Sequence, residues 1–211
     1  AVIASPALFM GVMLTTSLIK TFRLRGAQLK MFATATVLAL VMHVLSLEWS
    51  YQLAWFFPEL PPSMAEPLQR LMGADIPWWT LIGTMAVAPA ICEELAFRGF
   101  ILSGLQRSGR IWLAIGLSSL AFGIMHMIPQ QVFNATLLGL VLGIMAVRSN
   151  SLLPGVLFHL IYNSLGVIHS RIGGELLREF SGNPMIRDAG GQMLYSPTMV
   201  VLAGLIALPL L

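Results

Sequence analysis

Long runs without charged residues recur along this chain, and they constrain its fold more than any other feature. Hydrophobic residues make up 57% of the 211 residues and charged residues only 10%. Because a membrane-crossing helix needs about 20 mostly apolar residues, this composition excludes an ordinary soluble domain. It predicts an all-α, polytopic protein of the cell membrane with about seven transmembrane helices. We expect these spans near residues 1–19, 31–47, 78–92, 111–128, 132–147, 151–169 and 196–211.

The connections between these runs alternate in charge. Basic residues without acidic companions lie at 20–30, 107–110 and 148–150, and acidic residues lie in the alternate connections. Cytoplasmic connections of membrane proteins carry an excess of Lys and Arg. The alternation therefore predicts that these three connections are cytoplasmic and that the N-terminus lies outside. A seven-span topology satisfies all of these assignments together.

We expect three parts along the chain. Residues 1–77 would hold N-terminal membrane helices and an interfacial segment, 78–170 a helical core with the polar site, and 171–211 an extramembrane loop and a C-terminal membrane helix. The aromatic residues of 48–77 are typical of the headgroup level, with substrate gating as the alternative. The glycines and mixed charges of 170–195 predict a solvated loop.

Two further expectations concern packing and completeness. Glycines at 116, 123, 139 and 143 predict close helix approach, because small residues are the main packing device in lipid. The chain starts in apolar sequence without an initiator Met, which is consistent with a fragment of a longer protein.

Glu93, Glu94 and Arg98 form a charged cluster inside an otherwise apolar segment. An ionisable side chain near the bilayer centre costs roughly 2.5–3.5 kcal/mol, so three within six residues must be paired, hydrated or used in function. The spacing of Glu94 and Arg98 favours an ion pair across one helical turn. Glu93 lies about 100° further round the helix, which leaves its carboxylate free for chemistry.

Three more polar residues fall at a similar depth on other predicted helices. His126, His159 and Asn163 lie, like Glu93, about 16–24 Å from the nearest basic connection if the segments are helical. We therefore expect them to meet at one level in the membrane. For the other polar and aromatic residues at this depth we expect structural roles: hydrogen-bonded packing for His43 and His169, a helix cap for Asn134, and packing around the site for Phe97 and Phe122.

This set of side chains is sufficient for amide hydrolysis without a Ser or Cys nucleophile. A carboxylate and a histidine can polarise a water molecule, and a second histidine with an asparagine can stabilise the oxyanion. Cys92 has apolar and acidic neighbours that disfavour its thiolate. The alternative is a zinc site of Glu93, His126 and His159, although HExxH is absent and Arg98 would oppose a cation. We expect no cofactor, with zinc as that alternative.

The sequence resembles a known family at three motifs on separate predicted helices. Glu93-Glu94-Leu-Ala-Phe-Arg98, Phe122-Gly-Ile-Met-His126 and His159-Leu-Ile-Tyr-Asn163 are similar to the EExxxR, FxxxH and HxxxN motifs of the CAAX protease and bacteriocin-processing family, which includes the type II CAAX prenyl proteases. The resemblance covers about residues 80–168. It implies a glutamate-type intramembrane endopeptidase, although members are often labelled metalloproteases.

The resemblance also implies roles for the motif residues and for partners. Glu93 would activate water with help from His126, His159 and Asn163 would form the oxyanion hole, and Glu94 and Arg98 would support the site. Residues 1–75 and 196–211 more weakly resemble bacterial proteins in which this domain follows an ABC-type permease segment. A permease partner or fusion is therefore one expectation, and no nucleic-acid partner is expected.

Three functions compete at this point. The leading hypothesis is an endopeptidase that cleaves a membrane-associated or lipidated peptide. The second is a non-catalytic membrane partner, such as a bacteriocin-immunity or ABC-transporter-associated subunit. The third is a proton-coupled transport unit that uses the same Glu and His residues, but the sequence has no inverted repeat or paired broken helices to favour it.

Overall fold

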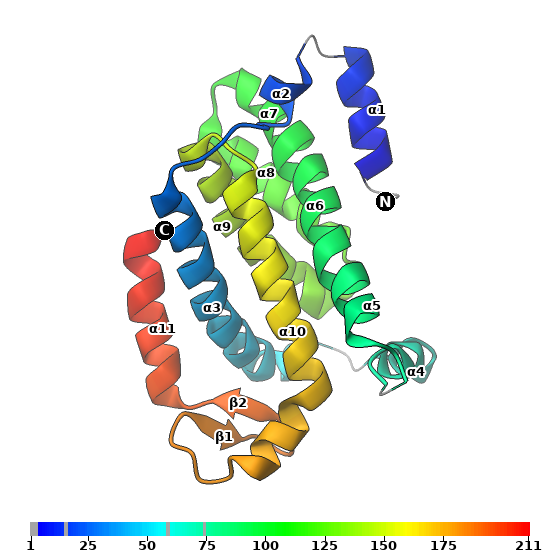
Figure 1. Cartoon of the computed structure of the whole chain (residues 1–211), viewed down its shortest axis with the longest axis vertical. Coiled ribbons are helices and arrows are strands. Elements are labelled where there is room, and N and C mark those ends of the chain that lie inside the picture. The colour runs from blue at the N-terminus through cyan, green and yellow to red at the C-terminus, as the bar shows by residue number, and fades with distance from the viewer. Residues whose placement is uncertain (1–3, 15–16, 58–59, 74) are drawn as a thin grey trace.

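The computed structural model describes residues 4–14, 17–57, 60–73 and 75–211, which form a helical bundle with one short β-hairpin at its end (Figure 1). Among the described residues, the all-α prediction is therefore correct apart from this hairpin. The helices up to the site-bearing segment are α1 (Ala4–Leu14), α2 (Leu18–Thr21), α3 (Leu29–Gln52), η1 (Ala54–Phe56) and α4 (Pro62–Leu71). After that segment come α8 (Ile111–Ile124), α9 (Pro129–Ser149), α10 (Leu153–Glu179) and α11 (Pro197–Leu210).

Three helical segments in the described residues are long and apolar enough to cross a membrane: Leu29–Gln52, Trp78–Ser108 and Pro129–Ser149. The chain is thus a membrane protein, but seven spans are not shown. α8 and α11 are apolar, yet each has 14 residues, or about 21 Å of helix, which is short for a bilayer core of about 30 Å. α10 has 27 residues, but its polar second half lowers its hydropathy. The expected first span includes residues outside the described ones.

The site-bearing segment is a continuous helical rod that contains two π-helical stretches. It consists of α5 (Trp78–Ile82), η2 (Gly83–Val87), α6 (Ala88–Glu94), η3 (Leu95–Ile101), α7 (Leu102–Leu105) and η4 (Gln106–Ser108). η2 and η3 are π-helical stretches on either side of α6, which ends in Glu93 and Glu94. Such wide turns inside α-helices are frequent at functional sites.

The core forms where α9 and α10 pack against α3 (Figure 1). The expected close approach is confirmed at three of the four glycines. An added Cβ would lie 2.0 Å from Thr136 Oγ1 at Gly123, 2.9 Å from Ser119 Cβ at Gly139 and 2.9 Å from Ile115 Cγ2 at Gly143. At Gly116 the prediction is wrong, because no heavy atom lies within 4 Å of the added Cβ.

Arg23, one of the basic residues in the predicted cytoplasmic connection, is buried at the end of the bundle. Its guanidinium donates to Ser103 Oγ at 3.0 Å, to the Ala146 carbonyl at 2.7 Å and to Gln106. Burial lowers the pKa of this guanidinium from its ordinary value. Arg23 therefore ties the connection before α3 to α7, η4 and α9, whereas Lys20, Arg25 and Lys30 are exposed.

The opposite end of the bundle contradicts the loop predicted at 170–195. α10 continues through Gly173 and Gly174 to Glu179, and β1 (Ile186–Asp188) pairs antiparallel with β2 (Met193–Tyr195). Gly190 and Gly191, both with positive φ, supply the tight turn that a two-residue hairpin requires. The hairpin is fixed to α3 by an ion pair of 2.7 Å between Arg187 and Glu48. Sequence reasoning took the glycines as loop markers and missed the alternation of residues around them.

Candidate active site

Glu94 and Arg98 form a fully buried ion pair within the site-bearing rod. Arg98 Nη1 donates to Glu94 Oε1 at 2.7 Å, and the two side chains are 1% and 0% exposed. The pairing expected from their spacing is confirmed. The guanidinium also lies 4.2 Å from the ring centroid of Phe122, and its Nη2 donates to the Gly139 carbonyl at 3.4 Å. Arg98 thus connects the rod to α8 and α9.

His159 of α10 lies between the two carboxylates. Its Nδ1 is 3.2 Å from Glu94 Oε1, and its Nε2 is 3.8 Å from Glu93 Oε2. Because the Glu94 carboxylate already accepts from Arg98, it collects two donors on one oxygen, while Oε2 has no hydrogen-bond partner among the described residues. With His159 neutral the cluster has a formal charge of −1, and with His159 protonated it is neutral.

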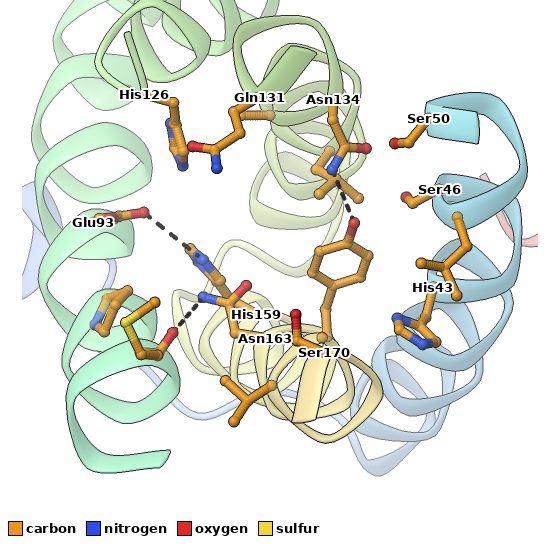
Figure 2. Close-up of a pocket in the computed structure, with 18 of the residues that line it drawn as sticks. His43, Ser46, Ser50, Glu93, His126, Gln131, Asn134, His159, Asn163 and Ser170 are labelled. Atoms are coloured by element: carbon orange, nitrogen blue, oxygen red, sulfur yellow. Dashed lines mark hydrogen bonds and ion pairs between the residues drawn. The ribbon is translucent and has the colours of Figure 1, made fainter. Parts of the chain in front are cut away.

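Glu93, His126, His159 and Asn163 all line one cavity of about 460 Å³ (Figure 2). Glu93 comes from α6, His159 and Asn163 come from α10, and His126 faces the cavity from the turn after α8. The Glu93 side chain is 16% exposed, in contrast to the fully buried Glu94. The structure therefore brings together the four residues predicted to be catalytic and separates the two adjacent carboxylates.

His126 lies on a turn rather than on the helix predicted over 111–128. α8 ends at Ile124 because Met127 adopts a left-handed conformation and Pro129 starts the next helix. His126 Nδ1 lies 3.0 Å from the Phe122 carbonyl. Since a carbonyl can only accept, Nδ1 carries the proton in this arrangement. Nε2 of the neutral ring is then left with a lone pair.

Asn163 replaces a hydrogen bond that proline removes from the rod. Pro89 has no N–H, so the Met85 carbonyl four residues earlier lacks its usual α-helical donor. Asn163 Nδ2 donates to this carbonyl at 3.1 Å. This contact joins α10 to the π-helical stretch η2 and orients the amide. The second hydrogen on Nδ2 is available for another acceptor.

Comparison with family models assigns the segment that carries these residues. Residues 75–165 match the model described as "Type II CAAX prenyl endopeptidase Rce1-like". This segment is therefore similar to an Rce1-like CAAX endopeptidase domain. The match covers less than half of the chain but includes all seven motif residues. No curated protein and no solved structure matches the chain.

The resemblance to the CAAX protease family predicted from the three motifs is thus confirmed, and an intramembrane peptidase is the class of activity that this family implies. The matched range extends from just before the site-bearing rod to the part of α10 just beyond Asn163. α1, α3, the hairpin and α11 lie outside the Rce1-like domain, although α3 supplies one wall of the cavity.

Sequence reasoning missed the polar wall opposite Glu93. Asn134 is five residues inside α9 and is not the predicted cap; it accepts from Trp49 Nε1 and donates to the Tyr162 hydroxyl, both at 3.0 Å. Figure 2 shows Gln131 beside His126 at the cavity. His43 is buried and its ring packs against His169, which agrees with the packing role predicted for both, but His169 Nδ1 has no hydrogen-bond partner among the described residues. His43 also lines the cavity. Only the pairing of distant helices reveals this wall, because single polar residues carry no sequence motif.

The zinc alternative finds little support in the donor set. Glu93 and His159 are adjacent, but no group of three or more His, Cys, Asp or Glu side chains in the described part of the chain could hold a metal ion. Both ring nitrogens of His159 face carboxylates, and Arg98 lies directly beside Glu94. These residues do not fit a His₂Glu centre. Cys92 does not line the cavity.

Proposed function

We propose that this protein is an intramembrane endopeptidase that hydrolyses a peptide bond of a membrane-associated or lipidated substrate, with Glu93 and His126 activating water. One observation carries the proposal: the Rce1-like segment contains Glu93, His126, His159 and Asn163, and all four face the same cavity (Figure 2). A cavity of about 460 Å³ has room for a short stretch of peptide.

The geometry favours Glu93 as the general base. Its carboxylate faces the cavity, whereas the neighbouring Glu94 is committed to Arg98 and His159. A water molecule that donates one proton to Glu93 and the other to His126 Nε2 would direct a lone pair at the substrate carbonyl. Glu93 then takes the proton as the carbon–oxygen bond forms, and returns it to the leaving amine.

His159 and Asn163 are suited to stabilise the oxyanion. A protonated His159 keeps Nδ1–H on Glu94 and has a second N–H on Nε2, and Asn163 has one amide hydrogen left after its contact with Met85. Both donors are held by buried partners, so they need little reorganisation when negative charge develops. Glu94 and Arg98 act through His159 and are positioning residues in this scheme.

The test compares membrane peptides by mass spectrometry in cells that produce either the native chain or Glu93→Gln. The substitution keeps the size of the side chain and removes the base. We expect a precursor that accumulates only in the variant and defined shorter products in native cells. Glu179→Gln, at an exposed position of α10, serves as the matched control and should give the native peptide pattern.

Two results would contradict the proposal. Identical peptide sets with equal amounts of native and Glu93→Gln protein would favour the non-catalytic membrane partner, including a permease-associated subunit. Retained cleavage by Glu93→Gln would show that the reaction uses another base. Purified native protein in liposomes, tested on the accumulated precursor, then shows whether the chain itself performs the cleavage.

A further inference from the structure

The β-hairpin lies outside the Rce1-like domain but close to the active-site cavity. A second cavity, of about 480 Å³, lies between α3, α10 and the hairpin and is lined by residues 191–194 from the turn and β2. Leu47, Ser50 and Ser170 line both this cavity and the active-site cavity. The two spaces therefore adjoin.

The hairpin register directs one strand edge toward this second cavity. Ala189 N donates to the Gln192 carbonyl at 3.0 Å, and Ser196 N donates to the Met185 carbonyl at 2.9 Å. Hydrogen-bonded pairs alternate in antiparallel strands, so the peptide groups of Met193 and Tyr195 point away from β1. Figure 1 shows β2 on the side of β1 that faces the helical bundle.

This edge has unused hydrogen-bonding capacity. Beyond the hairpin, no backbone hydrogen bond of the described residues involves the N–H of Met193 or of Tyr195. Buried backbone groups of this kind are normally paired, so an unpaired strand edge beside a cavity is a template for another strand. The edge is also held in place, because Arg187 in β1 is bonded to Glu48 and lies 5.4 Å from the ring of Tyr51.

We propose that the substrate binds as an extended strand along the outer edge of β2, which leads its backbone into the active-site cavity. This inference rests on the proposed peptidase function and specifies how the substrate is held. The occupant is a peptide segment next to the bond to be cleaved, bonded through its own N–H and C=O groups.

The chemistry of a membrane substrate explains why it would pair with a strand edge. A helical peptide protects each peptide bond inside its own hydrogen-bond ladder, and unwinding it in an apolar setting leaves several backbone groups unpaired. Each unpaired group costs free energy, which opposes exposure of the scissile bond. Strand addition to β2 replaces the lost bonds with the Met193 and Tyr195 peptide groups. The unwound substrate is thereby stabilised in the second cavity, next to the active-site cavity.

The test removes one N–H from each edge of the hairpin. Met193→Pro removes the donor that faces the cavity, and Asp188→Pro removes a donor on the outer edge of β1, which faces away from it. Asp188→Pro also removes the acceptor for Gly191 N in the turn, so it disturbs the hairpin at least as much as Met193→Pro does. The probe is the precursor that accumulates in Glu93→Gln membranes, presented to purified protein in liposomes. We expect Met193→Pro to lower kcat/KM about tenfold, while Asp188→Pro changes it less than about twofold. Equal losses in both variants, or none in Met193→Pro, would overturn the inference.

A second measurement does not depend on the hairpin tolerating proline. In a Glu93→Gln, Cys92→Ser background, with copper phenanthroline added as the oxidant, Met193→Cys should form a disulfide with a precursor that carries one Cys near its cleavage site. Asp188→Cys is the control and should not crosslink. Crosslinking at both positions or at neither would reject strand addition at β2. Absence of any cleavage by the native chain is a different result, since it rejects the proposed function itself.

Discussion

Two regions meet at the end of α6, and each contains one of two adjacent carboxylates. One carboxylate is buried, and the other faces the cavity. Glu94 belongs to a closed region in which its side chain is 0% exposed and pairs with Arg98 and His159, while Phe122 packs against Arg98. Glu93 belongs to an open region, the cavity, where its side chain is 16% exposed. The adjacent residues Glu93 and Glu94 thus belong to different regions: Glu94 to the buried ion-pair cluster and Glu93 to the surface of the cavity.

The difference shows what each region can contribute. Loss of either partner of a buried ion pair leaves an uncompensated buried charge and destabilises the fold. The closed region is therefore suited to fixing helices in position. The carboxylate in the cavity keeps access to water and to a substrate, which a general base needs. Substitutions in the closed region should therefore affect folding first, and substitutions in the open region should affect chemistry first.

The largest expected effect is on catalysis, at Glu93. Glu93→Gln should lower the cleavage rate by about 10²–10⁴-fold, because the variant lacks a group that accepts the proton of the attacking water. Its thermal unfolding temperature in detergent should stay near that of the native chain, since the ion-pair contact of Glu93 is a long one, to His159 Nε2 at 3.8 Å. A large loss of thermal stability in Glu93→Gln would show that the two regions are not separate.

Arg98→Ala should show the reverse pattern, with stability lost first. Removal of one partner leaves the Glu94 carboxylate buried without its cation, at a cost of roughly 3–5 kcal/mol. Thermal unfolding and the yield of folded protein measure this loss. The double variant Glu94→Leu, Arg98→Met should recover part of the stability because no charge then stays unpaired. If Arg98→Ala unfolds at the same temperature as the native chain, the buried ion pair does not hold the helices in position.

Both regions could be predicted in part from the sequence. The Glu94–Arg98 pair could be predicted because both residues lie one turn apart on one helix, where spacing alone decides contact. The convergence of Glu93, His126, His159 and Asn163 could be predicted from depth and from three motifs. These inferences needed only local geometry or the resemblance.

The misses have a common physical cause. The Asn134 contacts to Trp49 and Tyr162, the burial of Arg23 and the wall formed by α3 all depend on which distant helices pack together. The wide turns around α6 also escaped prediction, although Pro89 marked where one carbonyl would lose its donor. Hydropathy also overestimated what the structure supports, because apolar runs such as 111–128 end early at a turn.

A smaller effect is expected where α10 passes the closed region. A Cβ at Gly155 would lie 3.0 Å from Glu94 Oε2, so Gly155→Ala should force the carboxylate to shift and cost about 1–3 kcal/mol. Gly174→Ala is the matched control in the same helix, since nothing lies within 4 Å of its added Cβ. It should be neutral or more stable, because Ala favours helix over Gly. Equal behaviour of the two variants in thermal unfolding would contradict tight packing around Glu94.

The smallest effect should come from the wall of the open region, which neutral hydrogen bonds hold. Trp49→Phe keeps an aromatic ring and removes the N–H that Asn134 accepts, so it should cost roughly 0.5–1.5 kcal/mol. Trp55→Phe, at a side chain that is 77% exposed, is the control and should change little. Thermal unfolding of both variants measures the difference. A loss in Trp49→Phe as large as that of Arg98→Ala would mean that the cavity wall, and not the buried ion pair, limits the stability of the bundle.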